Sequence, residues 1–266
     1  MMRPVPLHAY NPGSMTGAGN WTWLITGRVP TLIDAGVGIP QHLEELEKAL
    51  HGAALAQVLV THAHPDHAEG VMALESRMPS VRFLKMPWPE RDRTWPVEWR
   101  PLADGDRVEV GDVTATVVHT PGHAPDHMCV WHAETGTLFV GDLAIEGTSV
   151  WIPSSPAGDL AAYLSSLDRV IALNPSWLLP AHGPIIIKPV ALLRAYIAHR
   201  RERELQIIDA LRHGDTHTAA IVARVYPELA KGLVPRAEET VLAHLQKLER
   251  DGTARRVGDA WNIIEP

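Results

Sequence analysis

The sequence predicts an α/β catalytic domain followed by a small, mostly helical domain. Up to about residue 208, short apolar runs of strand character end in segments that carry histidine or aspartate. Beyond about residue 210 the apolar residues take helical spacing instead. The chain has 266 residues, of which 45% are hydrophobic, so it can bury one substantial core and a second, smaller one. We therefore expect a catalytic domain over residues 1–208 and a second domain over residues 209–266.

The first of these segments, residues 62–67, reads His-Ala-His-Pro-Asp-His and carries four metal-capable side chains. The apolar run 57–60 before it predicts a buried strand, whose end projects the segment out of the sheet. In extended chain, residues two apart point to the same side. His62 and His64 can therefore bind one ion together.

The second half of this segment predicts a change of direction. Pro65 fits the first turn of a helix, and the negative charge of Asp66 suits that position. Asp66 and His67 would then face the same pocket from a different angle. Three histidines and an aspartate this close would repel or desolvate one another unless a cation held them. The segment therefore predicts ligands for two adjacent metal ions.

Three later strands complete the set of candidate ligands. The strands, each with the candidate that follows it, are 113–118 with His123, 137–140 with Asp142, and 177–179 with His182. Gly141 lets the backbone bend sharply before Asp142. Each candidate thus lies at a strand end, where a rigid sheet positions irregular backbone.

Other polar residues near these segments are not expected to bind metal. Asp34 has weaker potential and is expected to form a turn or to contact a ligand from behind. His119 and His127 flank His123, and both are expected to be structural or to line the pocket. The remaining histidines have no metal-ligand context: His8, His42, His51, His132, His199, His213, His217 and His244.

The motif His-x-His-x-Asp-His, followed in order by a histidine, an aspartate and a histidine, resembles the metallo-β-lactamase-fold superfamily over about residues 5–187. The resemblance implies a four-layer αβ/βα sandwich with a dinuclear site at one edge of its two sheets. It also implies a first metal held by His62, His64 and His123, a second held by Asp66, His67 and His182, and a bridging Asp142. True class B β-lactamases typically lack the bridging aspartate and often use a cysteine, so antibiotic hydrolysis is not expected.

A two-metal site predicts hydrolysis. Two cations roughly 3.5 to 4 Å apart would lower the pKa of a water between them and make hydroxide available near neutral pH. That hydroxide would attack a carbonyl carbon or a phosphorus, and Asp66 is the candidate catalytic residue that orients it or accepts its proton. A ligand set without cysteine suits zinc, iron or manganese, and two zinc ions are the preferred cofactors.

Composition limits the compartment and the partners. The single cysteine, Cys129, lies in the apolar run 128–131 and is expected to be a buried strand residue, so no disulfide forms within one chain. The N-terminus lacks an apolar stretch suited to a signal peptide, and no segment approaches a membrane span. We expect a cytoplasmic protein without membrane contact. The net charge of -7 argues against a strong non-specific grip on nucleic acid.

Residues 194–204 are predicted to form an Arg-rich helix, and its role has two interpretations. Its Arg and His side chains would line a groove beside the site, or the helix presents a solvated face on which Arg200 and Glu204 pair across one turn. The second interpretation is preferred.

The last part of the chain predicts helices over residues 217–225 and 235–251 and a β-hairpin over 255–264. This order resembles a winged-helix domain. Its basic residues are offset by acidic ones, so we prefer packing against the catalytic domain, or lining its groove, to binding double-stranded DNA. Together with the Arg-rich helix, the order is similar to the β-lactamase-like protein 2 group. A member of that group is a single-strand-specific endoribonuclease, so the resemblance implies phosphodiester cleavage.

Two segments are candidate substrate walls. Residues 86–101 hold three tryptophans among prolines and are predicted to lack regular structure. Their rings would stack on a substrate as a stiff lid or cover a hydrophobic edge. Residues 148–154, just after Asp142, form the second candidate wall.

Four functions are consistent with these patterns. The preferred one is hydrolysis of a phosphodiester in single-stranded RNA, for which a basic groove leading to the metals is the discriminating feature. The alternatives are an ester or thioester hydrolase similar to hydroxyacylglutathione hydrolase, a DNA-binding regulator that senses metal or a ligand, and a persulfide dioxygenase with one iron. The expected partner is a small molecule or single-stranded RNA, and no oligomeric state is predicted.

Overall fold

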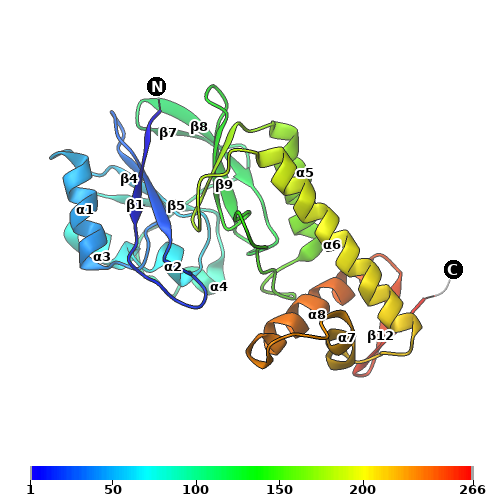
Figure 1. The fold of residues 1–266 in the computed structure, drawn as a ribbon. Helices are drawn as coiled ribbons and strands as arrows, with labels where there is room; N and C mark the ends of the chain where they lie inside the picture. The colour runs from blue at the N-terminus through cyan, green and yellow to red at the C-terminus, as the bar shows by residue number, and fades with distance from the viewer. Residues whose placement is uncertain (1, 265–266) are drawn as a thin grey trace.

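Two mixed β-sheets lie face to face in the N-terminal part of the chain (Figure 1). The computed structural model describes residues 2–264. The first sheet has the strand order β1-β2-β3-β4-β5-β6, and the second has the order β11-β10-β9-β8-β7. The strands of the first sheet are β1 (Pro4–His8), β2 (Trp21–Ile25), β3 (Thr31–Ile33), β4 (Gln57–Leu59), β5 (Arg82–Lys85) and β6 (Trp99–Pro101). Those of the second are β7 (Arg107–Val110), β8 (Val113–His119), β9 (Met128–His132), β10 (Thr137–Gly141) and β11 (Trp177–Pro180).

The four strands predicted from apolar runs are confirmed as β4, β8, β10 and β11. The alternation along β4 shows why its sequence is continuously apolar. Val58 and Val60 pack on the helix side of the first sheet, whereas Leu59 packs between the sheets with Phe139 of β10. Successive side chains of a strand point to opposite faces, so a strand buried on both faces needs apolar residues at every position.

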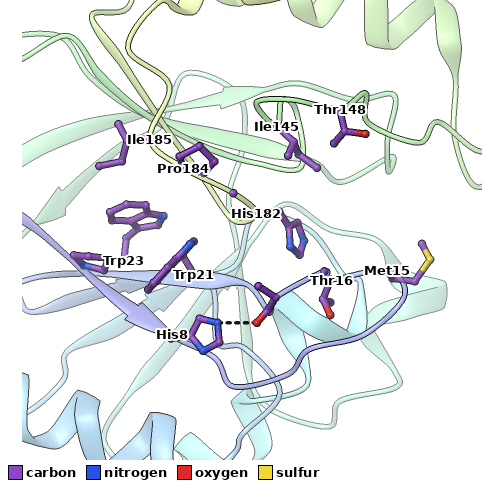
Figure 2. Close-up of a pocket in the computed structure, with 15 residues that line it drawn as sticks. His8, Met15, Thr16, Trp21, Trp23, Ile145, Thr148, His182, Pro184 and Ile185 are labelled. Atoms are coloured by element: carbon purple, nitrogen blue, oxygen red, sulfur yellow. Dashed lines mark hydrogen bonds between the residues drawn. The ribbon is translucent and has the colours of Figure 1, made fainter.

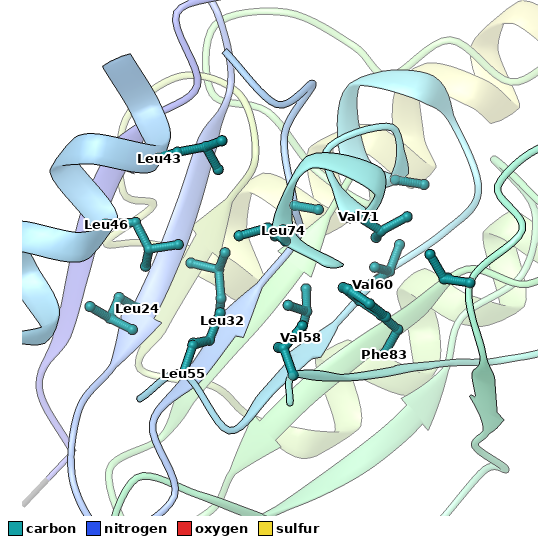
Figure 3. Close-up of a cluster of buried hydrophobic side chains, with 14 of the residues drawn as sticks. Leu24, Leu32, Leu43, Leu46, Leu55, Val58, Val60, Val71, Leu74 and Phe83 are labelled. Carbon is teal, nitrogen blue, oxygen red and sulfur yellow. The ribbon is translucent and has the colours of Figure 1, made fainter. Parts of the chain in front are cut away.

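Helices cover the outer face of each sheet and complete the four layers (Figure 1). The first sheet carries α1 (Pro40–Leu50) and α3 (Val71–Arg77), and the second carries α5 (Leu160–Leu173) and α6 (Pro189–Arg212). Leu43 and Leu46 of α1 pack against Leu24 and Leu32 of the first sheet (Figure 3). The short helix α2 (Pro65–Ala68) begins at Pro65, as predicted.

The long helix α6 belongs to two cores. Leu193 and Ile197 in its first half pack with the core outside the second sheet. Ile207 and Leu211 in its last turns are buried with the C-terminal helices instead. The boundary predicted at residue 208 therefore lies within this helix.

The C-terminal unit has the predicted order of two helices and a hairpin. After α6 come α7 (Thr218–Val225), the 3-10 helix η1 (Lys231–Leu233), α8 (Val234–Arg250), and the hairpin of β12 (Ala254–Val257) and β13 (Ala260–Ile263). Trp261 of the hairpin is buried against Val241 and Leu245 of α8. The unit lies beyond one end of the second sheet, joined to it through α6 (Figure 1).

The Trp-rich segment contains regular structure, contrary to the prediction. It includes the one-turn helix α4 (Pro89–Asp92) and strand β6, which pairs in parallel with β5. Trp95 is buried in the core outside the first sheet, and Trp88 and Trp99 pack against that core. Pro89 stands at the start of α4 and Pro101 lies in the edge strand β6, and at both positions no ladder hydrogen bond is lost. The rings therefore cover a hydrophobic edge, and the lid interpretation is wrong.

The Arg-rich segment is helical, as predicted, but Arg200 is not on a solvated face. The Arg200 side chain is buried and donates a hydrogen bond to the carbonyl oxygen of Val150. Glu204 instead pairs with Lys247 of α8 at 2.9 Å. The prediction failed because the loop after β10 covers Arg200, while the C-terminal unit supplies the partner of Glu204.

Cys129 is buried in β9, as predicted. Burial raises the pKa of its thiol to about 12, so the thiol is protonated and unreactive at neutral pH. Within residues 2–264, no helix is both long and apolar enough to cross a membrane.

Candidate metal centre

The ends of four strands converge at one edge of the two sheets. There the structure brings together all seven residues predicted as ligands. Their ligand atoms form three overlapping groups, each with all atoms within 4.8 Å of one another: His62, His64 and His123; His62, His67 and Asp142; and Asp66, His67 and His182. We call the trio with His123 the first group and the trio with His182 the second group.

The first group brings three imidazole nitrogens together. His62 Nε2 and His123 Nε2 each lie 2.9 Å from His64 Nδ1. One proton cannot bridge three nitrogens, whereas a cation accepts a lone pair from each. Burial, together with the neighbouring imidazoles, lowers the pKa of His64 to about 3 and that of His62 well below its ordinary value. These rings are therefore neutral, which is the form that binds metal.

The second group combines a carboxylate with two imidazoles. Asp66 Oδ2 lies 3.3 Å from His182 Nε2 and 3.5 Å from His67 Nε2. Burial alone would lower the pKa of His67, but the carboxylates of Asp66, Asp34 and Asp142 outweigh it and raise that pKa well above its ordinary value. So much buried negative charge requires a compensating positive charge.

Asp142 faces both groups. Its Oδ1 lies 3.4 Å from His67 Nε2 and 3.3 Å from His182 Nε2, while its Oδ2 lies 3.5 Å from His123 Nε2. Burial would raise the pKa of Asp142, but His67 and His182 hold it well below its ordinary value. The carboxylate is therefore ionised, with one oxygen toward each group.

The donor atoms fit divalent metal ions. His67 Nε2 and Asp142 Oδ1 are buried without a hydrogen-bond partner among the described residues. Imidazole nitrogens and carboxylate oxygens together suit zinc, iron or manganese. Glycine is required just before Asp142. Gly141 has a φ of 45°, which favours glycine, and a Cβ at this position would lie only 2.7 Å from Thr61 Oγ1.

Asp34 holds a candidate ligand from behind, as expected. Its Oδ2 lies 2.8 Å from His67 Nδ1, and its Oδ1 accepts a hydrogen bond from the backbone N–H of Thr61 at 2.7 Å. The contact with Nδ1 leaves His67 Nε2 free to face the second group.

The two histidines that flank His123 in the sequence have structural roles, as expected. His127 Nε2 accepts a hydrogen bond from the backbone N–H of Asp142 at 3.2 Å, and His127 Nδ1 lies 2.8 Å from Thr120 Oγ1. Burial and neighbouring charges lower the pKa of His127 to about 3, so the ring is neutral and can accept this bond. His119 Nε2 lies 2.9 Å from the carbonyl oxygen of Pro125.

A buried ion pair behind the first group was not foreseen. Lys85 Nζ lies 3.0 Å from Asp126 Oδ2, and both side chains are buried. The same carboxylate oxygen accepts a hydrogen bond from the backbone N–H of Ala63, between the two histidines of the motif, at 2.9 Å. A signal existed in the sequence, since Lys85 ends an apolar strand and Asp126 lies close to His123.

A cavity of about 700 Å³ adjoins the second group, and His182 is part of its wall (Figure 2). Most of the wall is apolar and comes from segments far apart in the sequence, including Met15, Trp21, Trp23, Ile145, Pro184 and Ile185. Of the predicted walls, only Thr148 contributes from residues 148–154, and none of the lining residues, all within the described range, is Lys or Arg. No pattern in the sequence predicted this pocket.

The chain matches two family profiles in succession. Residues 15–182 match the metallo-beta-lactamase superfamily, and residues 218–261 match the beta-lactamase associated winged helix domain. Both matches agree with the fold and with the order of the two units.

Individual proteins are similar over much or nearly all of the chain. The beta-lactamase-like protein 2 homolog of Drosophila melanogaster is 33% identical over 92% of this chain and 87% of its own length. The thioesterase pkgB of Emericella nidulans is 36% identical over 74% of this chain and 56% of its own length. The crystal structure of a beta-lactamase domain protein from Burkholderia ambifaria superposes with a TM-score of 0.83, at 24% identity, over 99% of this chain and 91% of that one.

Proposed function

Because the chain belongs to the metallo-beta-lactamase superfamily of metal-dependent hydrolases, we propose that its site hydrolyses an ester or thioester with an apolar acyl group. The observation that carries the proposal is the apolar cavity beside the second group. The cavity is lined by the indole rings of Trp21 and Trp23 and by the branched side chain of Ile145, which favour an apolar part of a substrate. The thioesterase among the relatives points in the same direction.

The chemistry of the cavity favours an acyl group over a nucleic acid. Recognition of a phosphodiester backbone relies on Lys and Arg, and the described lining residues include neither. The exposed Arg194 and Arg201 of α6 line a separate depression with Asp168, which shares no residue with the cavity. The basic groove expected of a nuclease is therefore absent from the cavity wall described here.

We assign the ligands of each metal ion from the groups of neighbouring side chains described above. His62, His64 and His123 would hold one metal ion, Asp66, His67 and His182 the other, and Asp142 would contact both. Two bound divalent ions supply a hydroxide near neutral pH and stabilise the negative charge that develops on the attacked oxygen. We take both to be zinc, and iron and manganese suit the same donors.

Asp66 is the proposed catalytic residue. Its side chain is 22% exposed, compared with 14% for Asp142 and 9% for His182, so it is the most accessible of these three side chains. Asn20 Nδ2 donates a hydrogen bond to the Asp66 carbonyl at 2.6 Å and holds its backbone. The carboxylate can orient the attacking water or take its proton.

Cleavage of single-stranded RNA is the second candidate function. The observation that favours it is the similarity to the beta-lactamase-like protein 2 homolog, which includes the winged-helix unit and extends over 87% of that protein. An RNA substrate would have to be bound by residues outside the cavity wall, because the wall offers no Lys or Arg for its phosphates.

The two candidates are separated by a substrate series on the zinc-loaded full chain. For p-nitrophenyl esters of increasing acyl length, kcat/KM should rise about fourfold per methylene until the cavity is filled, because each buried methylene contributes about 0.8 kcal/mol. Ile185→Ser should flatten this dependence, since Ile185 lines the cavity. Ile187→Ser is the matched control, because Ile187 is exposed and lies outside the wall. Cleavage of single-stranded RNA without ester or thioester turnover would instead establish the second candidate.

A further inference from the structure

The loop between β10 and α5 contacts the candidate metal centre on one side and the C-terminal unit on the other. On the metal side, the carbonyl oxygen of Trp151 lies 2.9 Å from His123 Nδ1. Because His123 Nε2 faces His64, Nδ1 is the nitrogen that carries the proton and donates it to this carbonyl. The position of the Trp151 carbonyl therefore determines the direction in which His123 Nε2 points.

One face of α8 holds the far side of this loop. Glu239 accepts hydrogen bonds from the backbone N–H of Ser154 at 3.3 Å and from its hydroxyl at 2.8 Å. Gln246 accepts a hydrogen bond from the backbone N–H of Ser155 at 2.8 Å. Residues seven apart lie on the same face of a helix, so both side chains reach the loop from one side of α8.

Two arginines hold the middle and the end of the same loop. Arg200 of α6 donates to the carbonyl oxygen of Val150, one residue before the carbonyl that faces His123. Arg250, four residues beyond Gln246 on the same face of α8, donates to both carboxylate oxygens of Asp159, which caps α5. The loop is thus tied to α6 and α8 from its middle to its end.

Different contacts hold successive parts of the loop. Val150 and Ile152 are both buried in the core outside the second sheet, whereas Ser154 is half-buried and Ser155 is exposed. The next residues, 153–158, contain no helix or strand. The hydrogen bonds that Glu239 and Gln246 accept therefore hold this segment where a regular element would have ladder bonds.

We propose that the C-terminal winged-helix unit is a positioning element of the metal centre, in which Glu239 acts through Ser154 and the loop to aim His123 Nε2 at the first group. The proposal rests on the metal centre of the proposed function and is independent of the substrate. It also gives the unit a use other than DNA binding, because this face of α8 is occupied by the catalytic domain. Glu239 touches neither metal nor substrate, so it is a positioning residue.

Loss of the Glu239 contact should weaken the binding of only one of the two metal ions. Loss of an outer contact to a ligand imidazole typically weakens metal binding by 10- to 100-fold. Glu239 is one step further removed, so we expect about a tenfold loss of affinity at the first group. The second group, which is held by Asp34 through His67, should keep its affinity.

The test is a Co²⁺ titration of the full metal-free chain against a competing chelator, monitored by the visible absorption of the bound ion. Glu239→Ala should weaken one of the two binding steps about tenfold and change its spectrum, and Glu239→Gln, which keeps an acceptor oxygen, should restore most of the affinity. Glu238→Ala on the neighbouring position is the control and should match the parent chain. A Glu239→Ala protein that is less stable but binds two Co²⁺ ions with parental affinity and spectrum would overturn the proposal.

A second variant guards against a Glu239→Ala protein that does not fold. Ser154→Ala removes only the hydroxyl partner of Glu239 and leaves the backbone bond in place. It should weaken the same binding step by a smaller factor, and the double variant should lose less than the product of the two single losses. Equal weakening of both steps, or independent losses, would refute coupling through this contact. Because Co²⁺ alone is the probe, failure of the ester assay would leave this result unaffected.

Discussion

Replacement of Lys85 by methionine tests the buried ion pair behind the metal-binding motif. The side chains of Lys85 and Asp126 are 1% and 0% exposed, and their charged atoms lie 3.0 Å apart. Lys85 also donates to Asp92 Oδ1 and to the Met86 carbonyl, both at 2.5 Å. Removal of one partner from a buried pair leaves an uncompensated charge, which costs about 3 to 5 kcal/mol. Methionine keeps most of the buried volume, so the cost reports the charge rather than a cavity.

Urea unfolding of the metal-free chain measures this cost. With a slope of about 3 kcal/mol per molar urea, the midpoint of Lys85→Met should fall by about 1 to 2 M. Lys48→Met is the control, because Lys48 is exposed and its loss should change stability by less than about 0.5 kcal/mol. The double variant with Asp126→Asn should recover part of the loss, since asparagine is neutral and still accepts the bond from Ala63. A loss below about 1 kcal/mol would refute the argument from buried charge.

The loss of stability in Lys85→Met should depend on pH. Burial raises the pKa of Asp126, and Lys85 opposes that rise. An acid whose pKa is higher in the folded than in the unfolded state binds its proton more tightly when folded, so stability falls as pH rises. Without Lys85 the folded-state pKa rises further. The stability gap between Lys85→Met and the parent chain should therefore shrink as the pH falls from 7 toward 5, and a gap that widens would contradict this sign.

Three further predictions concern other parts of the chain. Asp142→Ala should lower the bound metal from two ions to about one and abolish hydrolysis, and full activity in this variant, measured with metal content, would rule out two-metal hydrolysis. Burial lowers the pKa of His42 from 6.5 to about 4, so the free energy of unfolding should decrease by about 3 kcal/mol as the pH falls through that range. In His42→Gln, urea midpoints measured against pH should not show this decrease. Gly122→Ala should unfold or strongly destabilise the chain, because a Cβ there would lie 2.4 Å from the backbone of Tyr163, and an unchanged melting temperature would contradict it.

The positions of the ligands could be predicted from the sequence because each follows an apolar strand. Strand periodicity is local, and parallel packing then brings strand ends to one edge. The place of Asp34 behind a ligand followed the same logic, since Asp34 comes directly after β3, whereas its partner His67 came only from the structure. What could not be predicted depends on contacts between distant segments. Lys85 and Arg200 are buried against expectation because partners distant in the sequence compensate them, Asp126 in one case and the carbonyl of Val150 in the other.

The substrate cavity illustrates the same limit. Its wall joins Met15 from the loop after β1, Trp23 from β2, and Ile185 from the segment after β11, and no local pattern links these residues. Tryptophan content did attract attention in the sequence, but to residues 86–101. Those tryptophans instead pack on the core outside the first sheet. The sequence left open whether these rings form a lid or cover an edge, while Trp21 and Trp23 of the cavity lie in β2, where no pattern singled them out.

The two halves of the metal centre are supported by different parts of the fold. The first group is backed by the Lys85–Asp126 pair and, through His123, by the loop that α8 holds. The second group is backed by Asp34 and opens through His182 onto the cavity. Changes at Glu239 or Gln246 should therefore alter metal loading at the first group without changing acyl preference, whereas Arg236 of α8 contacts Met15 of the cavity wall. Changes in the cavity wall should alter acyl preference without changing metal loading. Glu239 and Gln246 would thus affect hydrolysis only through the loop, because the hydrogen bonds that they accept from Ser154 and Ser155 reach neither the metal ligands nor the cavity lining.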